Sequence, residues 1–264
     1  MTVYTLQDLE TFEINNVGFL VCPSGDYSQI TNFGNDCRFG DNCAFGDNTK
    51  FGRWCNFGSN CSFGNYCSFD DWCTFDECCD FGKECTFKQY NRFGSMCKFA
   101  INCWFANDCK FNVNCCFDDH CNFSEYSQFN EGNSFGADCT FGNYCNFDKD
   151  CTFDKSCTFS DNCKFAEHQS FGKWCRFGEN CRFDKNSYFE NIEESVDRIL
   201  KIDRIGSRAG CTYFFKTTNI IYVRCGCFFG TIVKFEEKVK ETHAYNEQYL
   251  NEYMKAIEYV KAIM

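Results

Sequence analysis

The stretch CRFGDNCAFGDNTKFGRWCNFGSNCSFGNYCSF, residues 37–69, repeats a six-residue unit without a change of phase. The pattern extends from Phe33 to Phe189, over which 27 phenylalanines stand six residues apart. A cysteine precedes the phenylalanine by two residues in 20 of the repeats, and a glycine follows it directly in 12. The unit is therefore C-x-F-G-x-x, and repetition at a fixed short period is typical of repeat architectures.

Each unit combines a short strand with a corner. The cysteine and the phenylalanine are two residues apart, so their side chains share one face of an extended segment. The G-x-x segment supplies residues that tolerate tight or left-handed backbone geometry. Because strands this short are not stable alone, successive coils of the chain must pair with one another. The repeat predicts an all-β parallel solenoid with Phe and Cys in its core.

Aromatic residues at the corners indicate how many strands make one coil. Seven aromatics occupy the position three before a repeat phenylalanine, and five of them fall on one row spaced by multiples of 18. This aromatic row consists of Trp54, Trp72, Tyr90, Tyr126 and Tyr144. Eighteen residues are three repeats, so we predict a three-sided parallel β-helix of about nine coils.

The repeat resembles the hexapeptide of the left-handed parallel β-helix superfamily over residues 31–190. The order is Phe, Gly or a small acid, two variable residues, Cys or Ser/Thr, and one variable residue. Members of that family usually have an aliphatic residue in place of the Phe, and Ser, Thr, Ala or Val in place of the Cys. The resemblance implies a left-handed coil and raises acyltransferase activity as one function, with a histidine as general base.

The chain is predicted to contain four segments. Residues 1–30 form an N-terminal cap and an irregular first coil, in which Val21 and Tyr27 remain in phase, and residues 31–190 form the β-helix. Asn191 and Glu194 begin a capping helix over 191–202, and 203–264 form a small α+β module. That module contains a hairpin of strands 212–217 and 220–226, then helices over 233–243 and 245–264. It resembles the tails of phage and prophage proteins.

The 26 cysteines allow three interpretations. The favoured one makes the 20 repeat cysteines small apolar core residues, as buried free cysteines often are. Disulfides along the ladder are geometrically allowed but need an oxidising compartment, so the redox state stays open. A metal store needs clustered thiolates, and only Cys225-Gly-Cys227 has ligand-like spacing, as a possible zinc site. We predict no metal and no cofactor.

One outward face combines cations with the aromatic row. The outward residues of every third strand, from Arg38 to Arg182, include five cations and no acid. Of the other two faces, one carries two cations and the other carries one. Cations beside aromatic rings favour a protein interface, or a surface for a nucleotide, nucleic acid or anionic glycan. The candidate binding surface consists of Arg38, Trp54, Trp72, Tyr90, Arg92, Lys110, Tyr126, Tyr144, Lys164 and Arg182.

Charge and histidine content bear on the remaining function classes. The formal net charge is −11, and residues 30–190 hold 23 Asp and Glu against 15 Lys and Arg. An acidic rod of this kind could mimic DNA, by analogy with pentapeptide-repeat proteins. The chain has only His120, His168 and His243 and no insertion in its repeats, which disfavours an acyltransferase. We predict no catalytic residues.

These observations predict a cytoplasmic, non-catalytic β-solenoid scaffold or protein-interaction module. A protein partner or self-association is expected, and a nucleic acid or another polyanion is the alternative partner. No apolar run is long enough to span a membrane, and no secretory signal is seen at the N-terminus.

Overall fold

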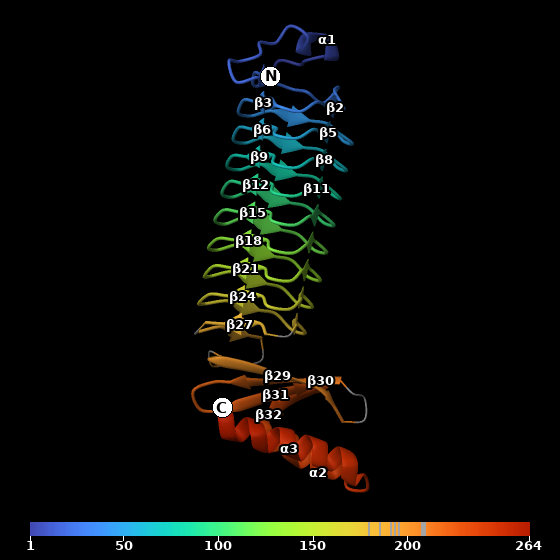
Figure 1. Ribbon diagram of the computed structural model, residues 1–264, viewed down its shortest axis with the longest axis vertical. Coiled ribbons are helices and arrows are strands. Elements are labelled where there is room, and N and C mark those ends of the chain that lie inside the picture. Colours follow the sequence, from blue (N-terminus) through green and yellow to red (C-terminus); the bar gives the residue numbers. More distant parts are fainter. Residues whose placement is uncertain (179, 185, 191, 193, 195, 207–209) are drawn as a thin grey trace. The chain divides into compact units, whose positions relative to one another are not determined.

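The computed structural model describes residues 1–264 except 179, 185, 191, 193, 195 and 207–209. The chain divides into two compact units, Met1–Phe165 with Phe171–Arg182 and Ala166–Ser170 with Phe183–Met264. In the first unit, short strands and corners wind into stacked coils (Figure 1). The second unit contains an antiparallel sheet and two helices.

Three parallel sheets form the walls of the solenoid, and each repeat strand pairs with the strand 18 residues away, as Thr86 does with Ser68 and Trp104. Sheet 1 contains β1 (Leu20–Cys22), β3 (Cys37–Phe39), β6 (Asn56–Phe57), β9 (Thr74–Phe75), β12 (Arg92–Phe93), β15 (Lys110–Phe111), β18 (Gln128–Phe129), β21 (Asn146–Phe147), β24 (Lys164–Phe165) and β27 (Arg182–Phe183). Sheet 2 contains β4 (Ala44–Phe45), β7 (Ser62–Phe63), β10 (Asp80–Phe81), β13 (Lys98–Phe99), β16 (Cys116–Phe117), β19 (Ser134–Phe135), β22 (Thr152–Phe153), β25 (Ser170–Phe171) and β28 (Tyr188–Phe189). Sheet 3 contains β2 (Asn32–Phe33), β5 (Lys50–Phe51), β8 (Ser68–Phe69), β11 (Thr86–Phe87), β14 (Trp104–Phe105), β17 (Asn122–Phe123), β20 (Thr140–Phe141), β23 (Thr158–Phe159) and β26 (Arg176–Phe177). The prediction of a three-sided parallel solenoid of about nine coils is confirmed.

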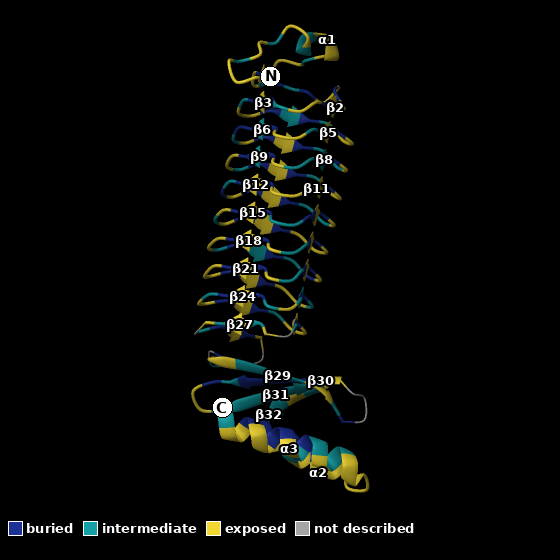
Figure 2. Ribbon diagram, viewed as in Figure 1, coloured by how far each residue is buried: buried dark blue, intermediate teal, exposed yellow. Residues whose placement is uncertain are grey.

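Stacked phenylalanine rings fill the centre of the solenoid. Of the 27 repeat phenylalanines, 26 are buried and Phe183 is half-buried. Phe105 lies parallel to Phe87 and Phe123, with ring centroids 4.8 Å apart in both pairs. It meets the next phenylalanine of its own coil, Phe111, nearly edge to face at 5.1 Å. Phe105 thus uses both favourable aromatic geometries. Buried and exposed residues alternate along the coils (Figure 2).

The repeat cysteines fill the space beside the rings. Nineteen of the 20 are buried, Cys181 is half-buried, and none of these 20 described residues forms a disulfide. Most of these thiols donate a weak hydrogen bond to a corner carbonyl of the previous coil, as Cys85 Sγ does to the Gly64 oxygen at 3.5 Å. Burial raises the pKa of the Cys109 thiol to about 12, which keeps it protonated at neutral pH. The interpretation of these cysteines as small core residues therefore agrees with the structure.

The last residue of each repeat turns the corner in the left-handed backbone region. Twenty-five non-glycine residues from Asp36 to Asn186 have φ between 56° and 66° there. Asn and Asp, which tolerate this region best, account for 12 of them. The glycine after the phenylalanine has a different role from the one expected. A Cβ on Gly52 would lie 2.7 Å from the Asn35 backbone nitrogen, so glycine allows close approach between coils where it occurs.

Asp and Asn side chains directly before the left-handed corner residue form hydrogen bonds between successive coils. Asp119 Oδ1 accepts a hydrogen bond from the backbone N–H of Ala137, 18 residues later, at 2.7 Å. The same bond recurs at eight corners, from Asn35, Asp41, Asp47, Asn65, Asp71, Asn107, Asp119 and Asn143. Each bond satisfies a backbone donor that the strand ladders leave free. Part of the acidity of the corners is thus explained by backbone hydrogen bonding.

The N-terminal segment forms an irregular coil, as expected, with one change of register. Tyr27 is buried and stacks on Phe45, in agreement with its predicted phase. Val21 is exposed, because β1 pairs Val21 with Arg38 and Cys22 with Phe39. The prediction that Val21 points inward is therefore wrong, since this coil is one residue shorter than the others. Before it, helix α1 (Leu6–Leu9) is a single capped turn.

The C-terminal unit is a four-stranded antiparallel sheet with two helices. Its strands are β29 (Arg198–Ile205), β30 (Gly210–Lys216), β31 (Ile221–Cys225) and β32 (Phe228–Thr231), and its helices are α2 (Ile232–Thr242) and α3 (Glu247–Ile263). The predicted hairpin and both predicted helices are confirmed. None of the helices in the described residues is long and apolar enough to cross a bilayer.

The capping helix predicted over 191–202 is wrong for its second half. Residues from Arg198 onward form β29, in which Ile199 pairs with Phe215 and Ile202 with Thr212. Pairing with β30 favours the extended form for the β-branched residues of this segment, Ile199, Ile202 and Ile205. Positions 191, 193 and 195 of the predicted helix lie outside the described residues.

Thiol labelling of the native protein is expected to separate the cysteines by burial. Cys116, Cys211 and Cys227 are exposed and should react within minutes, whereas the 19 buried repeat cysteines should react only after denaturation. Mass spectrometry of the labelled peptides measures both classes. Fast labelling of most repeat cysteines would contradict this core.

Replacing Asp119 with alanine should destabilise the solenoid by about 1–2 kcal/mol, because the backbone N–H of Ala137 loses its acceptor. Glu77→Ala is the matched control: Glu77 occupies the same place in another repeat and is exposed, with no side-chain hydrogen bond in the described part of the chain. Chemical denaturation of both variants measures the difference. Equal effects would show that the corner bond contributes nothing.

Candidate binding surface

The cations of sheet 1 lie on one continuous outward ladder. Register pairs join Arg38 to Asn56, Thr74 to Arg92, and Arg92 to Lys110. Lys164 follows Asn146 on β24, and Arg182 lies on β27, the next strand of the sheet. All five cations are exposed. The sequence therefore predicted correctly that these residues share one face.

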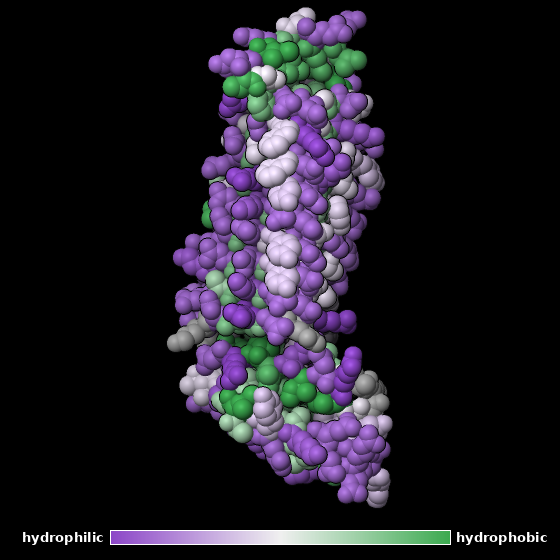
Figure 3. Space-filling model, in the orientation of Figure 1, coloured by the Kyte–Doolittle hydropathy of each residue, from purple (hydrophilic) through white to green (hydrophobic). Residues whose placement is uncertain are grey.

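The aromatic row runs along the corner that leads into sheet 1. Trp54 stacks on Trp72 with centroids 5.2 Å apart, and Trp72 stacks on Tyr90 at 4.3 Å. Tyr126 and Tyr144 form a second stack at 5.1 Å. Figure 3 shows pale rings as a column on the surface, with a hydrophilic break between an upper and a lower group. The row is thus two separate stacks.

Stacking decides which part of each ring is accessible. The five rings are between 36 and 48 % exposed. Within a stack the ring faces cover one another, so the ring edges and the tyrosine hydroxyl groups face outward. Free faces remain only at the ends of the two stacks. A ligand that lies flat on every ring, as stacked bases do on a single-strand binding protein, does not fit this arrangement.

The aromatic residues occupy backbone that does not favour them. Trp54, Trp72 and Tyr90 have φ of 64°, 66° and 64°. Asn and Asp, which adopt this region at lower cost, occupy 12 of the 25 non-glycine corners. The exposed corner residues Tyr66 and Trp174 have the same backbone conformation, with φ of 60° and 61°. What distinguishes the aromatic row is therefore the stacking of its rings on consecutive coils.

A shallow hollow of about 310 Å³ lies beside the first stack. It is lined by Phe19, Trp54, Asn56, Trp72, Thr74, Tyr90 and Arg92. Thr74 donates a hydrogen bond to the Asn56 side chain across two coils of sheet 1. The hollow thus has an aromatic wall, amide and hydroxyl groups, and a single cation. Sequence analysis missed Phe19, because it lies outside the repeat.

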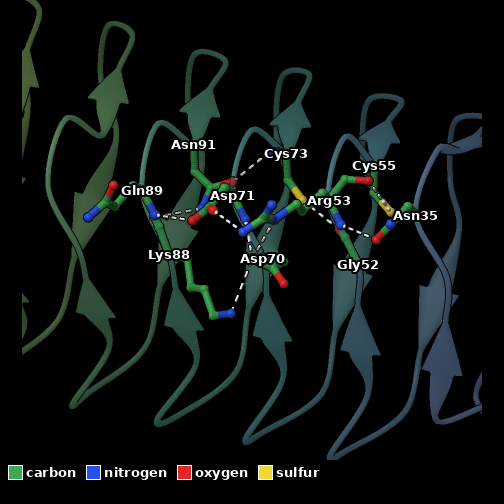
Figure 4. Close-up of polar contacts among 10 residues, drawn as sticks. All are labelled: Asn35, Gly52, Arg53, Cys55, Asp70, Asp71, Cys73, Lys88, Gln89 and Asn91. Carbon is green, nitrogen blue, oxygen red and sulfur yellow. Dashed lines mark hydrogen bonds and ion pairs between the residues drawn. The ribbon is translucent and has the colours of Figure 1, made fainter.

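Charged residues link three coils in the same corner as the first stack, at the one or two positions that precede each ring of the stack (Figure 4). Arg53 lies 3.6 Å from Asp70 and 3.1 Å from Asp71, and Lys88 lies 3.2 Å from Asp70. Partial burial opposes ionisation of Asp70, but the Asp71 backbone N–H and the two cations outweigh it and lower its pKa. The spacing of 18 between Arg53 and Asp71, and between Asp70 and Lys88, could have revealed this cluster in the sequence.

The structure gathers only part of the ten candidate residues. Trp54, Trp72, Tyr90 and Arg92 surround the hollow. Tyr126 and Tyr144 form the separate stack, and Lys164 and Arg182 follow corners that hold asparagine. The first stack with the hollow is therefore the best-formed part of the surface.

The residues considered for catalysis or metal binding have other surroundings. His120 precedes β17 of sheet 3 and His168 precedes β25 of sheet 2, while the His243 ring stacks on Tyr253. Cys225 Sγ accepts a hydrogen bond from Thr212 Oγ1 at 3.2 Å, and Cys227 is exposed. Among the described residues, no three His, Cys, Asp or Glu side chains lie close enough to hold a metal ion.

Comparisons with protein-family models, curated proteins and solved structures find no match to this chain. The resemblance to the left-handed β-helix superfamily thus stays a prediction from the repeat.

Asp70→Asn should lower stability at pH 7 by less than about 1 kcal/mol, because its ion pairs are partly solvated. A carboxyl whose pKa is lowered on folding stabilises the protein above its unfolded pKa of 3.8, and the contribution is lost as pH falls from that value through the lower folded pKa. The difference between wild type and variant should therefore decrease as the pH is lowered below 3.8. Denaturation over a pH series measures it, with Asp76→Asn as the control without an ion pair in the described chain. A difference that does not change as the pH is lowered would contradict this role.

Proposed function

We propose that this protein is a non-catalytic, rigid scaffold that binds a partner protein through the aromatic and basic surface of sheet 1. The observation that carries the proposal is the stack of Trp54, Trp72 and Tyr90, half-exposed on left-handed backbone beside a hollow. Trp, Tyr and Arg are the residues that dominate binding energy at protein interfaces.

Preorganisation supports the proposal. The three rings are held by stacking on one another, so their side chains have little freedom left to lose when a partner binds. Backbone ladders fix the coils that carry them. A preordered apolar ridge of this kind suits a partner that inserts side chains into the hollow at its side.

The charge of the surface indicates the character of the partner. Arg38, Arg92 and Lys110 face outward on sheet 1, and no acid occupies an outward position of that sheet. An acidic partner surface would be attracted there, although the chain as a whole carries a net charge of −11. Binding should therefore weaken as salt is added.

Substitution by asparagine tests the surface without disturbing the corner, because asparagine already occupies equivalent corners. The double variant Trp72→Asn with Tyr90→Asn should lose at least tenfold of the affinity for a partner isolated from the native cells. The matched control is Tyr66→Asn with Trp174→Asn, two exposed aromatic corner residues outside the row. Calorimetry with the purified partner, or sedimentation if the partner is a second copy, measures the effect.

A charge-reversed variant, Arg92→Glu with Lys110→Glu, should weaken the same interaction and reduce its dependence on salt. Circular dichroism and thermal melting establish that each variant remains folded. Equal binding by the surface variants and the Tyr66/Trp174 control would refute the proposal.

A further inference from the structure

One position of the aromatic row, between its two stacks, has no aromatic ring. From Trp54 to Tyr144 every position of the row is a ring except Asp108. Rings on adjacent coils stack with centroids 4.3–5.2 Å apart. Tyr90 and Tyr126 are two coils apart, so their rings are separated by roughly 10 Å, twice the spacing between paired strands. A planar ring midway between them would stack on both.

Asp108 occupies the position of the row between these two rings. Asp108 has a shorter side chain than the tyrosines on both sides and is half-buried, whereas Asp138, whose neighbours in its row are His120 and Ser156, is exposed. Within the described chain, no hydrogen bond or ion pair engages the Asp108 carboxylate. The gap therefore offers two aromatic faces and a free acceptor between them.

Cations lie beside the gap on sheet 1. Lys110 follows Asp108 by two residues and pairs in register with Arg92, and both side chains are exposed. These two cations would attract an anionic group on a ligand and would repel a planar cation such as a guanidinium. A ligand that satisfies the whole site needs a planar ring, N–H donors on its inner edge, and an anionic group outside.

We propose that the gap at Asp108 binds a guanine base that carries a phosphate. The base stacks between Tyr90 and Tyr126, and its N1–H and exocyclic amino group donate to the Asp108 carboxylate. Its phosphate pairs with Lys110 and Arg92. Adenine has an acceptor at the position of the guanine N1–H and would place it against the carboxylate, so the site discriminates between the two purines. This site shares Tyr90, Arg92 and Lys110 with the partner surface proposed above, and Asp108 belongs to this site alone.

Titration of the full chain with GMP and with AMP, by calorimetry or NMR at millimolar nucleotide, tests the proposal. GMP should bind at least tenfold more tightly than AMP, because hydrogen bonds to a charged group are stronger than those between neutral groups. Asp108→Asn should weaken GMP binding by about tenfold. Asp108→Tyr should abolish GMP binding, because the new ring fills the gap; tyrosine already occupies this corner in three other coils of the row.

Asp138→Tyr replaces a corner carboxylate whose neighbours on the adjacent coils are His120 and Ser156, so it fills no gap between two tyrosines; it is the control and should bind GMP like the wild type. A single-stranded oligonucleotide with one guanine distinguishes a nucleic acid from a free nucleotide as the source of the base. Absence of GMP binding to the wild type would overturn the proposal, as would unchanged binding to Asp108→Tyr or equal affinity for GMP and AMP. Partner binding by the Asp108 variants is measured separately, so either proposal can fail alone.

Discussion

The stacking of phenylalanine rings along the axis is the interaction on which the rest of the solenoid depends. Phe87, Phe105 and Phe123 lie parallel at 4.8 Å, close to the spacing of paired β-strands. The same rise therefore satisfies the rings inside and the backbone ladders in the walls. Every other regularity inherits this spacing, including the weak hydrogen bonds of the thiols and the bonds from corner Asp and Asn side chains. A core of large flat rings leaves narrow spaces between them, and a thiol is small and apolar enough to fill these.

The corners connect this core to the surface. Each corner requires one residue in the left-handed region, and Asn or Asp satisfies that requirement at the lowest cost. Where the chain instead places Trp or Tyr on consecutive coils of one row, the spacing set by the core brings the exposed rings into stacking contact. The arrangement of the candidate surface is thus a consequence of core geometry. The same geometry makes the position of Asp108 a gap one ring thick, because its neighbours in the row are tyrosines.

Charge is distributed by position as well as by total. Asp41, Asp47, Asp71 and Asp119 accept backbone hydrogen bonds from the next coil, and Asp70 pairs with Arg53 and Lys88. These carboxylates stabilise the contacts between coils, which offers an explanation for corner acidity that does not require DNA mimicry. The outward positions of sheet 1, by contrast, hold cations and no acid. A strongly acidic chain can therefore present one face suited to an anionic partner.

The sequence by itself determined the coil, its three walls and the division between inside and outside, because a six-residue period without slips fixes which side of every strand each residue occupies. It also determined that the cations and rings share one face, since residues 18 apart lie on adjacent coils. Only the tertiary structure decided that the ring faces are covered by stacking, because that depends on side-chain orientation and not on position. It also placed Phe19 beside the hollow and turned Val21 outward in a coil one residue short. Residues 198–205 show the same limit: their apolar pattern fits a helix as well as a strand, and the partner strand β30 selected the extended form.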